Sequence, residues 1–284
     1  MRIYLDCYPC FLGQALQAGR FATGDEETLK RVLDAAADVI PKIPKDASPP
    51  EIGGIIHRIV REMTGDDDPY RAVKAENLAE AKRHYAAMKG HVRAAPDPLA
   101  YAARLAIVGN IIDYALVRDF DIENEIFSLA GKSLEIDDMP RLRTALETAS
   151  SVLYLGDNVG ETVFDKVFIE ELGVPVTYAV RGRPVLNDVT ADDAAASGLD
   201  EAARILSSGS AAPGTPLDEC SEEFLEIFRT ADVVISKGQG NYESLSGTER
   251  PVFFLLRAKC PVVAGDLNVP EGALILKGMN LPEA

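Results

Sequence analysis

The chain of 284 residues is 47% hydrophobic and 26% charged, a composition typical of a folded protein with one large or two modest domains. Its 45 acidic residues outnumber 29 basic ones, and the formal net charge of −16 argues against nonspecific nucleic-acid binding, which needs a basic surface. No segment approaches the ~20 consecutive apolar residues of a membrane span, and the N-terminus, MRIYLDCYPC, lacks a signal peptide's apolar core. We therefore expect a cytoplasmic protein with neither a membrane nor a nucleic-acid partner.

Residues 1–150 are expected to form a helical domain, because their apolar side chains recur at helical spacing. Ser48 has the chemistry of an N-cap before Glu51, and prolines between residues 41 and 50 interrupt the helices on either side. The expected helices span residues 11–22, 25–40, 51–63, 72–88 and 99–117.

Two polar residues lie within the last of these otherwise apolar helices. Asn110 and Asp113 are one turn apart and therefore share a helix face. Because polar groups among apolar neighbours need partners, the pair either makes buried hydrogen bonds to a neighbouring loop or contributes to the wall of a binding site. The helix alone leaves both interpretations open.

Two of the four cysteines suggest a structural metal site. Cys7 and Cys10 form a CxxC motif, and a disulfide is disfavoured in a reducing compartment. A structural zinc site needs four ligands, which His57 and Cys260 could complete if the fold brought three distant segments together. The alternative is a pair of half-buried thiols at the start of a helix.

Residues 151–284 have a different pattern, in which short β-rich runs alternate with helical segments. This alternation predicts a Rossmann-like α/β/α domain of three layers with a mainly parallel sheet, on which the helical region packs. Residues 207–216 (SSGSAAPGTP) are expected to form a flexible loop. The expected strands span residues 152–155, 175–180, 233–236, 252–256 and 261–264.

Polar turns follow three of these strands. They read GDN at 156–158, RGRPVLNDV at 181–189 and SKGQGNYE at 236–243. Because the carboxyl ends of parallel strands lie at one edge of a sheet, we expect the turns to converge on one crevice. An isolated Asp-Asn pair is common in capped turns, but here the turns jointly supply carboxylates, amides, cations and closely spaced glycines. Such a set suits a hard divalent cation beside a phosphate group.

Read in order, the motifs GDNVGETVFD, RGRPVLNDVT and SKGQGNYESL resemble those of the damage-control phosphatases. The helical half adds CYPC, DPY and GNIID, and CYPC is similar to a feature of the archaeal and bacterial branch. The family, formerly a domain of unknown function, also includes an ARMT-like branch. The resemblance extends from Cys7 to about Cys260.

This resemblance implies a metal-dependent phosphatase that hydrolyses phosphate monoesters of small metabolites, such as sugar phosphates or damaged phosphometabolites. The cation would be manganese, magnesium, cobalt or nickel. Its implied ligands are Asp157, Asn158 and Asp188, with Asp192 and Asp193 as competitors for the third position. The nucleophile stays open between an Asp carboxylate and a water molecule.

Further roles follow for residues around these ligands. Lys237 would contact the phosphate as the family implies, and we expect Arg183, in preference to Arg181, to neutralise charge with it. Glu161 is a candidate for proton transfer or, alternatively, an ordinary acidic residue at a helix start. The match of Asn110 and Asp113 to the family's GN-x-x-D element favours their functional interpretation. The expected substrate-binding residues are Arg183, Lys237, Gly240, Asn241, Asn110 and Asp113.

Two other activities remain open at this point. The chain could be an S-adenosylmethionine-dependent carboxyl methyltransferase, an activity also attributed to the ARMT-like branch, with SKGQGNYES as its glycine-rich loop. It could also be a noncatalytic metabolite-binding protein with a structural metal. A cation site beside lysine and arginine favours the phosphatase. The sequence predicts neither a physiological substrate nor an oligomeric state.

Overall fold

The computed structural model describes residues 1–109 and 122–281. Within these ranges seven strands form one sheet in the order β1-β7-β6-β5-β2-β3-β4, and only the pair β6–β7 is antiparallel. This confirms the mainly parallel sheet. The strands are β1 (Ile136–Asp137), β2 (Val152–Leu155), β3 (Val176–Val180), β4 (Arg204–Ser207), β5 (Val233–Lys237), β6 (Val252–Arg257) and β7 (Leu274–Met279).

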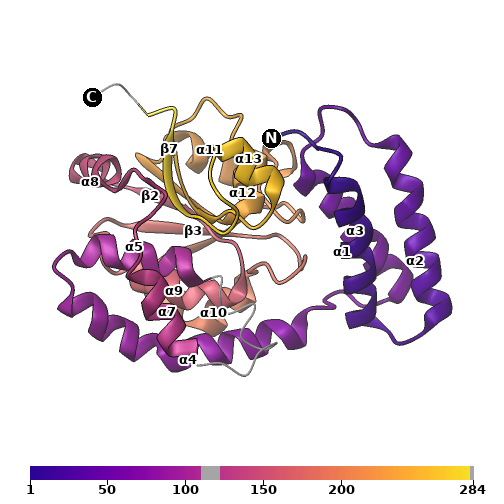
Figure 1. Cartoon of the computed structure of the whole chain (residues 1–284), viewed down its shortest axis with the longest axis horizontal. Coiled ribbons are helices and arrows are strands. Elements are labelled where there is room, and N and C mark those ends of the chain that lie inside the picture. The colour runs from indigo at the N-terminus through magenta and orange to yellow at the C-terminus, as the bar shows by residue number, and fades with distance from the viewer. Residues whose placement is uncertain (110–121, 282–284) are drawn as a thin grey trace.

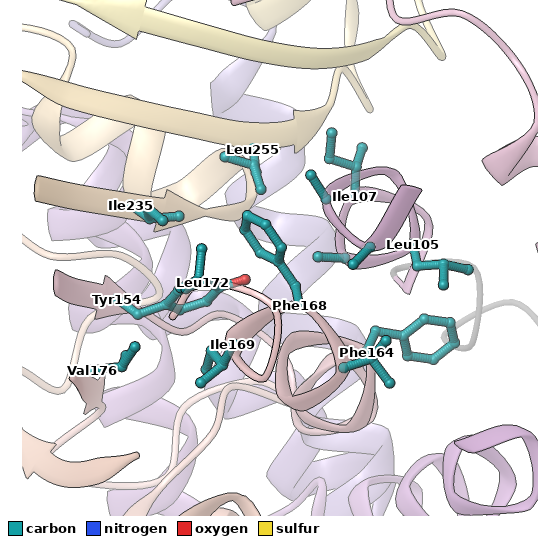
Figure 2. Packing of buried hydrophobic residues seen from close by; sticks show 14 of the residues in the cluster. Leu105, Ile107, Tyr154, Phe164, Phe168, Ile169, Leu172, Val176, Ile235 and Leu255 are labelled. Carbon is teal, nitrogen blue, oxygen red and sulfur yellow. The ribbon is translucent and has the colours of Figure 1, made fainter. Parts of the chain in front are cut away.

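Helices cover both faces of the sheet, so the three-layer architecture is confirmed (Figure 1). Alternate side chains along β2 serve the two faces: Tyr154 belongs to one apolar core, and Leu153 and Leu155 belong to the other. On the first face, the Phe168 ring points from α9 toward Leu255 of β6 (Figure 2). Helices of the first core are α4 (Arg71–Ala94), α5 (Pro98–Val108), α7 (Ile122–Ala130), α8 (Met139–Thr148), α9 (Thr162–Ile169) and α10 (Ala191–Ser197). Those of the second are α11 (Glu222–Thr230), α12 (Gly238–Leu245) and α13 (Pro261–Leu267).

The first three helices, α1 (Cys7–Ala22), α2 (Glu26–Val39) and α3 (Pro49–Thr64), pack around a core of their own. They lie beside α12 and α13 at one end of the sheet, and the long helix α4 connects them to the remainder (Figure 1). Ser48, the predicted N-cap, begins α3, and the structure adds a capping box in which the Ser48 hydroxyl donates to the Glu51 carboxylate. Because α5, α7, α8 and β1 all belong to the sheet's half of the molecule, residue 150 does not separate the cores.

Two details of the predicted α/β region are corrected. Residues 261–264 were expected as a strand but form the start of α13, because Pro261 suits a first helical turn and the Ala264 N–H donates to the Cys260 carbonyl. The segment 207–216 begins in β4 and continues as a buried connection in which Ser208 and Thr215 are almost inaccessible. In the described ranges, no helix is both long and apolar enough to span a membrane.

Candidate active site

The site lies where the strand order reverses. β2 pairs with β3 on one side and with β5 on the other, and in open parallel sheets this reversal opens a crevice at the carboxyl ends of the strands. Asp157 and Asn158 follow β2, Arg181 follows β3, Lys237 ends β5, and Lys259 comes shortly after β6. The predicted convergence of strand-end turns is therefore realised in the fold.

Main-chain pairing brings the β3–α10 loop against the end of β2. The Val189 N–H donates to the Asp157 carbonyl at 2.8 Å, and Asn158 and Asp188 form an isolated antiparallel bridge. All three candidate ligand side chains, Asp157, Asn158 and Asp188, are buried and line one pocket. Asn158 and Asp188 are thirty residues apart in the sequence, and these backbone contacts bring them together.

The two competitors for the third position lie elsewhere. Asp193 accepts hydrogen bonds from the Thr190 main chain and hydroxyl, and it forms an ion pair with Lys74 at 2.9 Å. Asp192 is exposed on α10. Of the three aspartates, Asp188 is the one placed beside Asn158.

The Arg181 guanidinium contacts both aspartates. Its Nε donates to Asp188 Oδ2 at 2.6 Å, its Nη1 donates to the Thr215 hydroxyl, and its Nη2 lies 3.8 Å from Asp157 Oδ1. Burial raises the pKa of Asp157, and the negative charges of Asp188 and Glu161 raise it further. Burial also raises the pKa of Asp188, although the Arg181 guanidinium opposes this shift.

This electrostatic arrangement fits a divalent cation. Two buried carboxylates and an amide face one pocket, and a single guanidinium does not remove the penalty for charging both. Arg181 Nη2 is itself buried without a hydrogen-bond partner in the described part of the chain. Oxygen donors of this kind are the ligands preferred by magnesium and manganese.

Gly238 allows the start of α12 to approach Asp157 closely. Its φ is +79°, and a Cβ at this position would collide with the Asp157 carboxylate. Gly240, two residues further on, packs against the Pro213 carbonyl, where a Cβ would also collide. The two glycines are therefore needed for close backbone packing around the pocket.

The pocket has a volume of about 260 Å³ and lies between the sheet edge and the first three helices. Lys259 lines it together with the three candidate ligands. The opposite wall includes Gln14 from α1 and Pro49 and Pro50 from the start of α3. The remaining lining residues are Leu186, Asn187, Pro213, Gln239, Gly240 and Glu243.

Lys237 does not line this pocket. It is 1% exposed, and its ammonium donates to Glu161 at 2.7 Å and to Asp165 at 2.8 Å. Although burial alone would lower the Lys237 pKa, the Asp165 and Glu161 carboxylates raise it above its usual range. Glu161 is also absent from the pocket lining and is 2% exposed, so the described geometry places neither the predicted phosphate contact of Lys237 nor the predicted proton transfer by Glu161 in this pocket.

Two other expected substrate-binding residues, Asn241 and Arg183, do not line the pocket either. Asn241 is fully buried: its amide donates to the carbonyls of Gly156 and Lys237 and accepts from Thr215, so it joins α12 to the end of β2. Arg183 is exposed and outside the pocket, whereas the less favoured Arg181 is buried beside Asp157 and Asp188, two residues that line it. The remaining two candidates, Asn110 and Asp113, lie outside the described residues.

The proposed cysteine site is not assembled. In residues 1–109 and 122–281, no group of three or more His, Cys, Asp or Glu side chains could hold a metal. His57 is buried against the Tyr70 ring, and burial lowers its pKa to about 4. Cys10 and Cys260 instead accept weak hydrogen bonds from Gln14 and Gln239, two residues of the pocket wall.

Sequence reasoning missed Lys259 and the amides of the pocket wall. Lys259 could have been found, because it follows a predicted parallel strand and so belongs to the same sheet edge as Asp157. Gln14 carried no such signal, since a surface glutamine on an amphipathic helix is ordinary. Gln239 lies within the third turn, but its charged neighbours were chosen as site candidates instead.

The fold and pocket define a class of protein: a doubly wound α/β enzyme-like domain with an acidic strand-end site and a covering helical unit. The profile described as "Damage-control phosphatase ARMT1-like domain" matches residues 3–275. The chain therefore belongs to the damage-control phosphatase ARMT1-like family, as the motifs indicated.

Individual relatives agree with this membership over nearly the whole chain. A damage-control phosphatase of Pyrococcus horikoshii is 34% identical and covers 97% of both chains. A damage-control phosphatase of Archaeoglobus fulgidus is 32% identical, over 98% of this chain and 99% of the relative. The crystal structure of a DUF89 family protein from P. horikoshii superimposes with a TM-score of 0.90 at 35% identity, covering 97% of this chain and 98% of the other. These similarities support phosphatase activity.

Proposed function

We propose that the chain is a metal-dependent phosphatase that hydrolyses phosphate monoesters of small metabolites, sugar phosphates or damaged phosphometabolites. Its cation would be manganese, magnesium, cobalt or nickel, held by Asp157, Asn158 and Asp188. The observation that carries the proposal is the shared pocket: three oxygen-donor side chains and the Lys259 ammonium line the same small cavity. A phosphate needs such a combination, because its oxygens bind both a cation and charge-assisted donors.

The chain's own residues divide the work of binding. Arg181 fixes the Asp188 carboxylate through its Nε, and the main-chain bridge between Asn158 and Asp188 keeps those two residues adjacent. Lys259 is the lysine of the pocket and would neutralise charge on the phosphoryl oxygens, the role expected earlier for Lys237. When bound, the divalent cation would supply Lewis-acid stabilisation of that same charge.

The rest of the pocket supports a small hydroxylated substrate. Gln14 and Asn187 place amide groups along the wall, and amides can both donate hydrogen bonds to hydroxyls and accept them. The volume of about 260 Å³ suits a metabolite rather than a macromolecule. Proline and leucine side chains complete the enclosure and limit water around the phosphate.

The methyltransferase alternative finds less support. Its glycine-rich loop would have to cradle a nucleoside, but Lys237 and Asn241 are buried in internal contacts and Gly240 packs against the Pro213 carbonyl. The noncatalytic alternative gives no role to Lys259 beside the acidic cluster. Stabilisation against heat by S-adenosylmethionine but by no divalent metal would favour the methyltransferase.

A phosphate-release screen tests the proposal. Small phosphorylated metabolites are assayed with each of the four metals, using wild type, Asp157→Ala and the matched control Asp192→Ala, whose side chain is exposed on α10. We expect metal-dependent release that falls at least about 100-fold in Asp157→Ala and is unchanged in Asp192→Ala. Full activity of Asp157→Ala, or no turnover of any ester with any metal, would contradict the assignment.

A further inference from the structure

A continuous chain of buried polar side chains runs behind the pocket and ends at Asn158. The Asn158 amide nitrogen donates to Glu161 Oε1 at 2.8 Å, and Lys237 donates to the other oxygen, Glu161 Oε2, at 2.7 Å. The same ammonium donates to Asp165 Oδ1 at 2.8 Å. All four side chains are at most 5% exposed, so water does not compete for these bonds.

The far end of this chain is fixed by two tyrosines from the sheet. Tyr154 of β2 donates to Asp165 Oδ1 at 2.7 Å, and Tyr178 of β3 donates to Asp165 Oδ2 at 2.8 Å. The two rings stack with centroids 5.2 Å apart and are inaccessible to solvent. Lys237 is consequently held on a rigid support rather than at the end of a mobile side chain.

The direction of the hydrogen bond at Asn158 decides which atom of its amide can serve as a ligand. An ionised carboxylate only accepts hydrogen bonds, so Glu161 must face the NH2 group of Asn158. The carbonyl oxygen, which lies on the other side of the amide carbon, is then directed away from Glu161. A cation can bind this oxygen but not the NH2 group.

We infer that Lys237 and Glu161 are positioning residues that fix the amide orientation of Asn158, so that its oxygen is presented to the divalent cation. Neither lines the pocket. The fixed positive charge of Lys237 keeps one oxygen of residue 161 directed toward it. The other oxygen of Glu161 then accepts from the NH2 group of Asn158 and so fixes the orientation of that amide. The inference rests on the proposed function, because it concerns the metal site of that function.

A single substitution reverses the constraint with almost no change in volume. In Glu161→Gln, the Lys237 ammonium would still attract the side-chain oxygen, so the new NH2 group would face Asn158. Asn158 would then turn its own oxygen toward residue 161 and its NH2 group toward the cation. We expect the dissociation constant for Mn²⁺, measured by titration calorimetry on metal-free protein, to rise about 10- to 100-fold.

A second substitution should restore binding. In the double variant Asn158→Asp with Glu161→Gln, one carboxylate oxygen accepts from the new NH2 group and the other remains available to Mn²⁺. We expect its dissociation constant to return to within about 10-fold of wild type. Asn158→Asp alone sets two carboxylates against each other and should bind more weakly than the double variant. A residue needed only for stability would not be rescued in this way.

The controls separate this inference from the function beneath it. Glu170→Gln, the same change at the exposed end of α9, should leave Mn²⁺ affinity unchanged. If Asp157→Ala binds Mn²⁺ as tightly as wild type, the proposed metal site fails, and the inference fails with it. If Asp157→Ala loses binding while Glu161→Gln retains it, the function stands and the positioning role is overturned. A double variant that folds without restored affinity, or does not fold, also overturns it.

Discussion

The two walls of the pocket differ in chemistry and in origin. The sheet edge contributes buried charge: Asp157 and Asp188 backed by Arg181, with Lys259 beside them. The helical unit contributes Gln14, Pro49 and Pro50, none of which carries charge. A parallel sheet fixes strand-end groups relative to each other within one continuous hydrogen-bonded frame, whereas α1 and α3 belong to a separate core. Under the proposed function, the sheet edge would bind the phosphate group and the helical wall would select the substrate.

The largest effect is expected at the junction of β5 and α12. Gly238→Ala places a Cβ against the Asp157 carboxylate and forces a left-handed φ on alanine. We expect activity to fall by about 100-fold or more and stability to fall by about 1–3 kcal/mol. Phosphate release and urea unfolding measure the two. Gly247→Ala, where the Cβ would meet no neighbouring atom, is the matched control and should change little.

Lys259→Met removes the positive charge of the sheet-edge wall. A hydrogen bond to a charged group contributes about 1.5–3 kcal/mol, so kcat/KM for a phosphate monoester should fall about 10- to 100-fold. Arg183→Met removes an exposed charge outside the pocket and should have no comparable effect. Steady-state kinetics of both variants decide the matter; a larger loss in Arg183→Met would transfer the phosphate contact to that residue.

Glu243, a titratable residue of the pocket wall, should make the stability of the protein depend on pH. Burial raises the pKa of its carboxyl from 4.5 to about 7, although the Gln239 amide donates to it. Because the folded value exceeds the unfolded one, the stabilisation is complete below pH 4.5 and is lost as the pH rises through about 7. Wild type should therefore lose about 1–3 kcal/mol, relative to Glu243→Gln, between pH 5 and 8. Parallel urea-unfolding profiles for the two proteins would refute this expectation.

The smallest effect is expected at the helical wall. Gln14→Ala removes one amide that could bind a substrate hydroxyl, a change of about 1 kcal/mol. The kcat/KM for a hexose phosphate should fall about 5-fold, while that for ethyl phosphate, which has no hydroxyl groups, should stay the same. Equal losses for both esters would mean that the helical wall does not select the substrate.

The parts of the site that followed from sequence are those that depend on strand ends. The turns that contain Asp157, Asn158 and Asp188 could be grouped because parallel strands bring their carboxyl ends to one edge, whereas the choice of Asp188 within its turn came from the family resemblance. The burial of Lys237 could not be predicted. It depends on how closely Glu161 and Asp165, in the helical segment that follows β2, pack against the end of β5. A lysine after a strand looks the same in sequence whether it faces ligand or protein.

The fold was predictable to a similar degree and for related reasons. Apolar runs and helical periodicity identified β2, β3, β5 and β6 and the helices α1 to α5. They did not separate the three-helix core from α5, α7 and α8, because packing partners are not encoded in periodicity. β1, β4 and β7 were not predicted, and the helix α13 between β6 and β7 was predicted as a strand.

We propose that a divalent cation binds at the sheet edge between Asp157, Asn158 and Asp188. Anomalous diffraction from crystals of wild-type protein soaked in Mn²⁺ tests this most directly. We expect a peak within coordination distance of oxygen atoms from these three side chains, and no such peak in Asp157→Ala. A peak at another position, such as the cysteines of α1, with none at the sheet edge would contradict it.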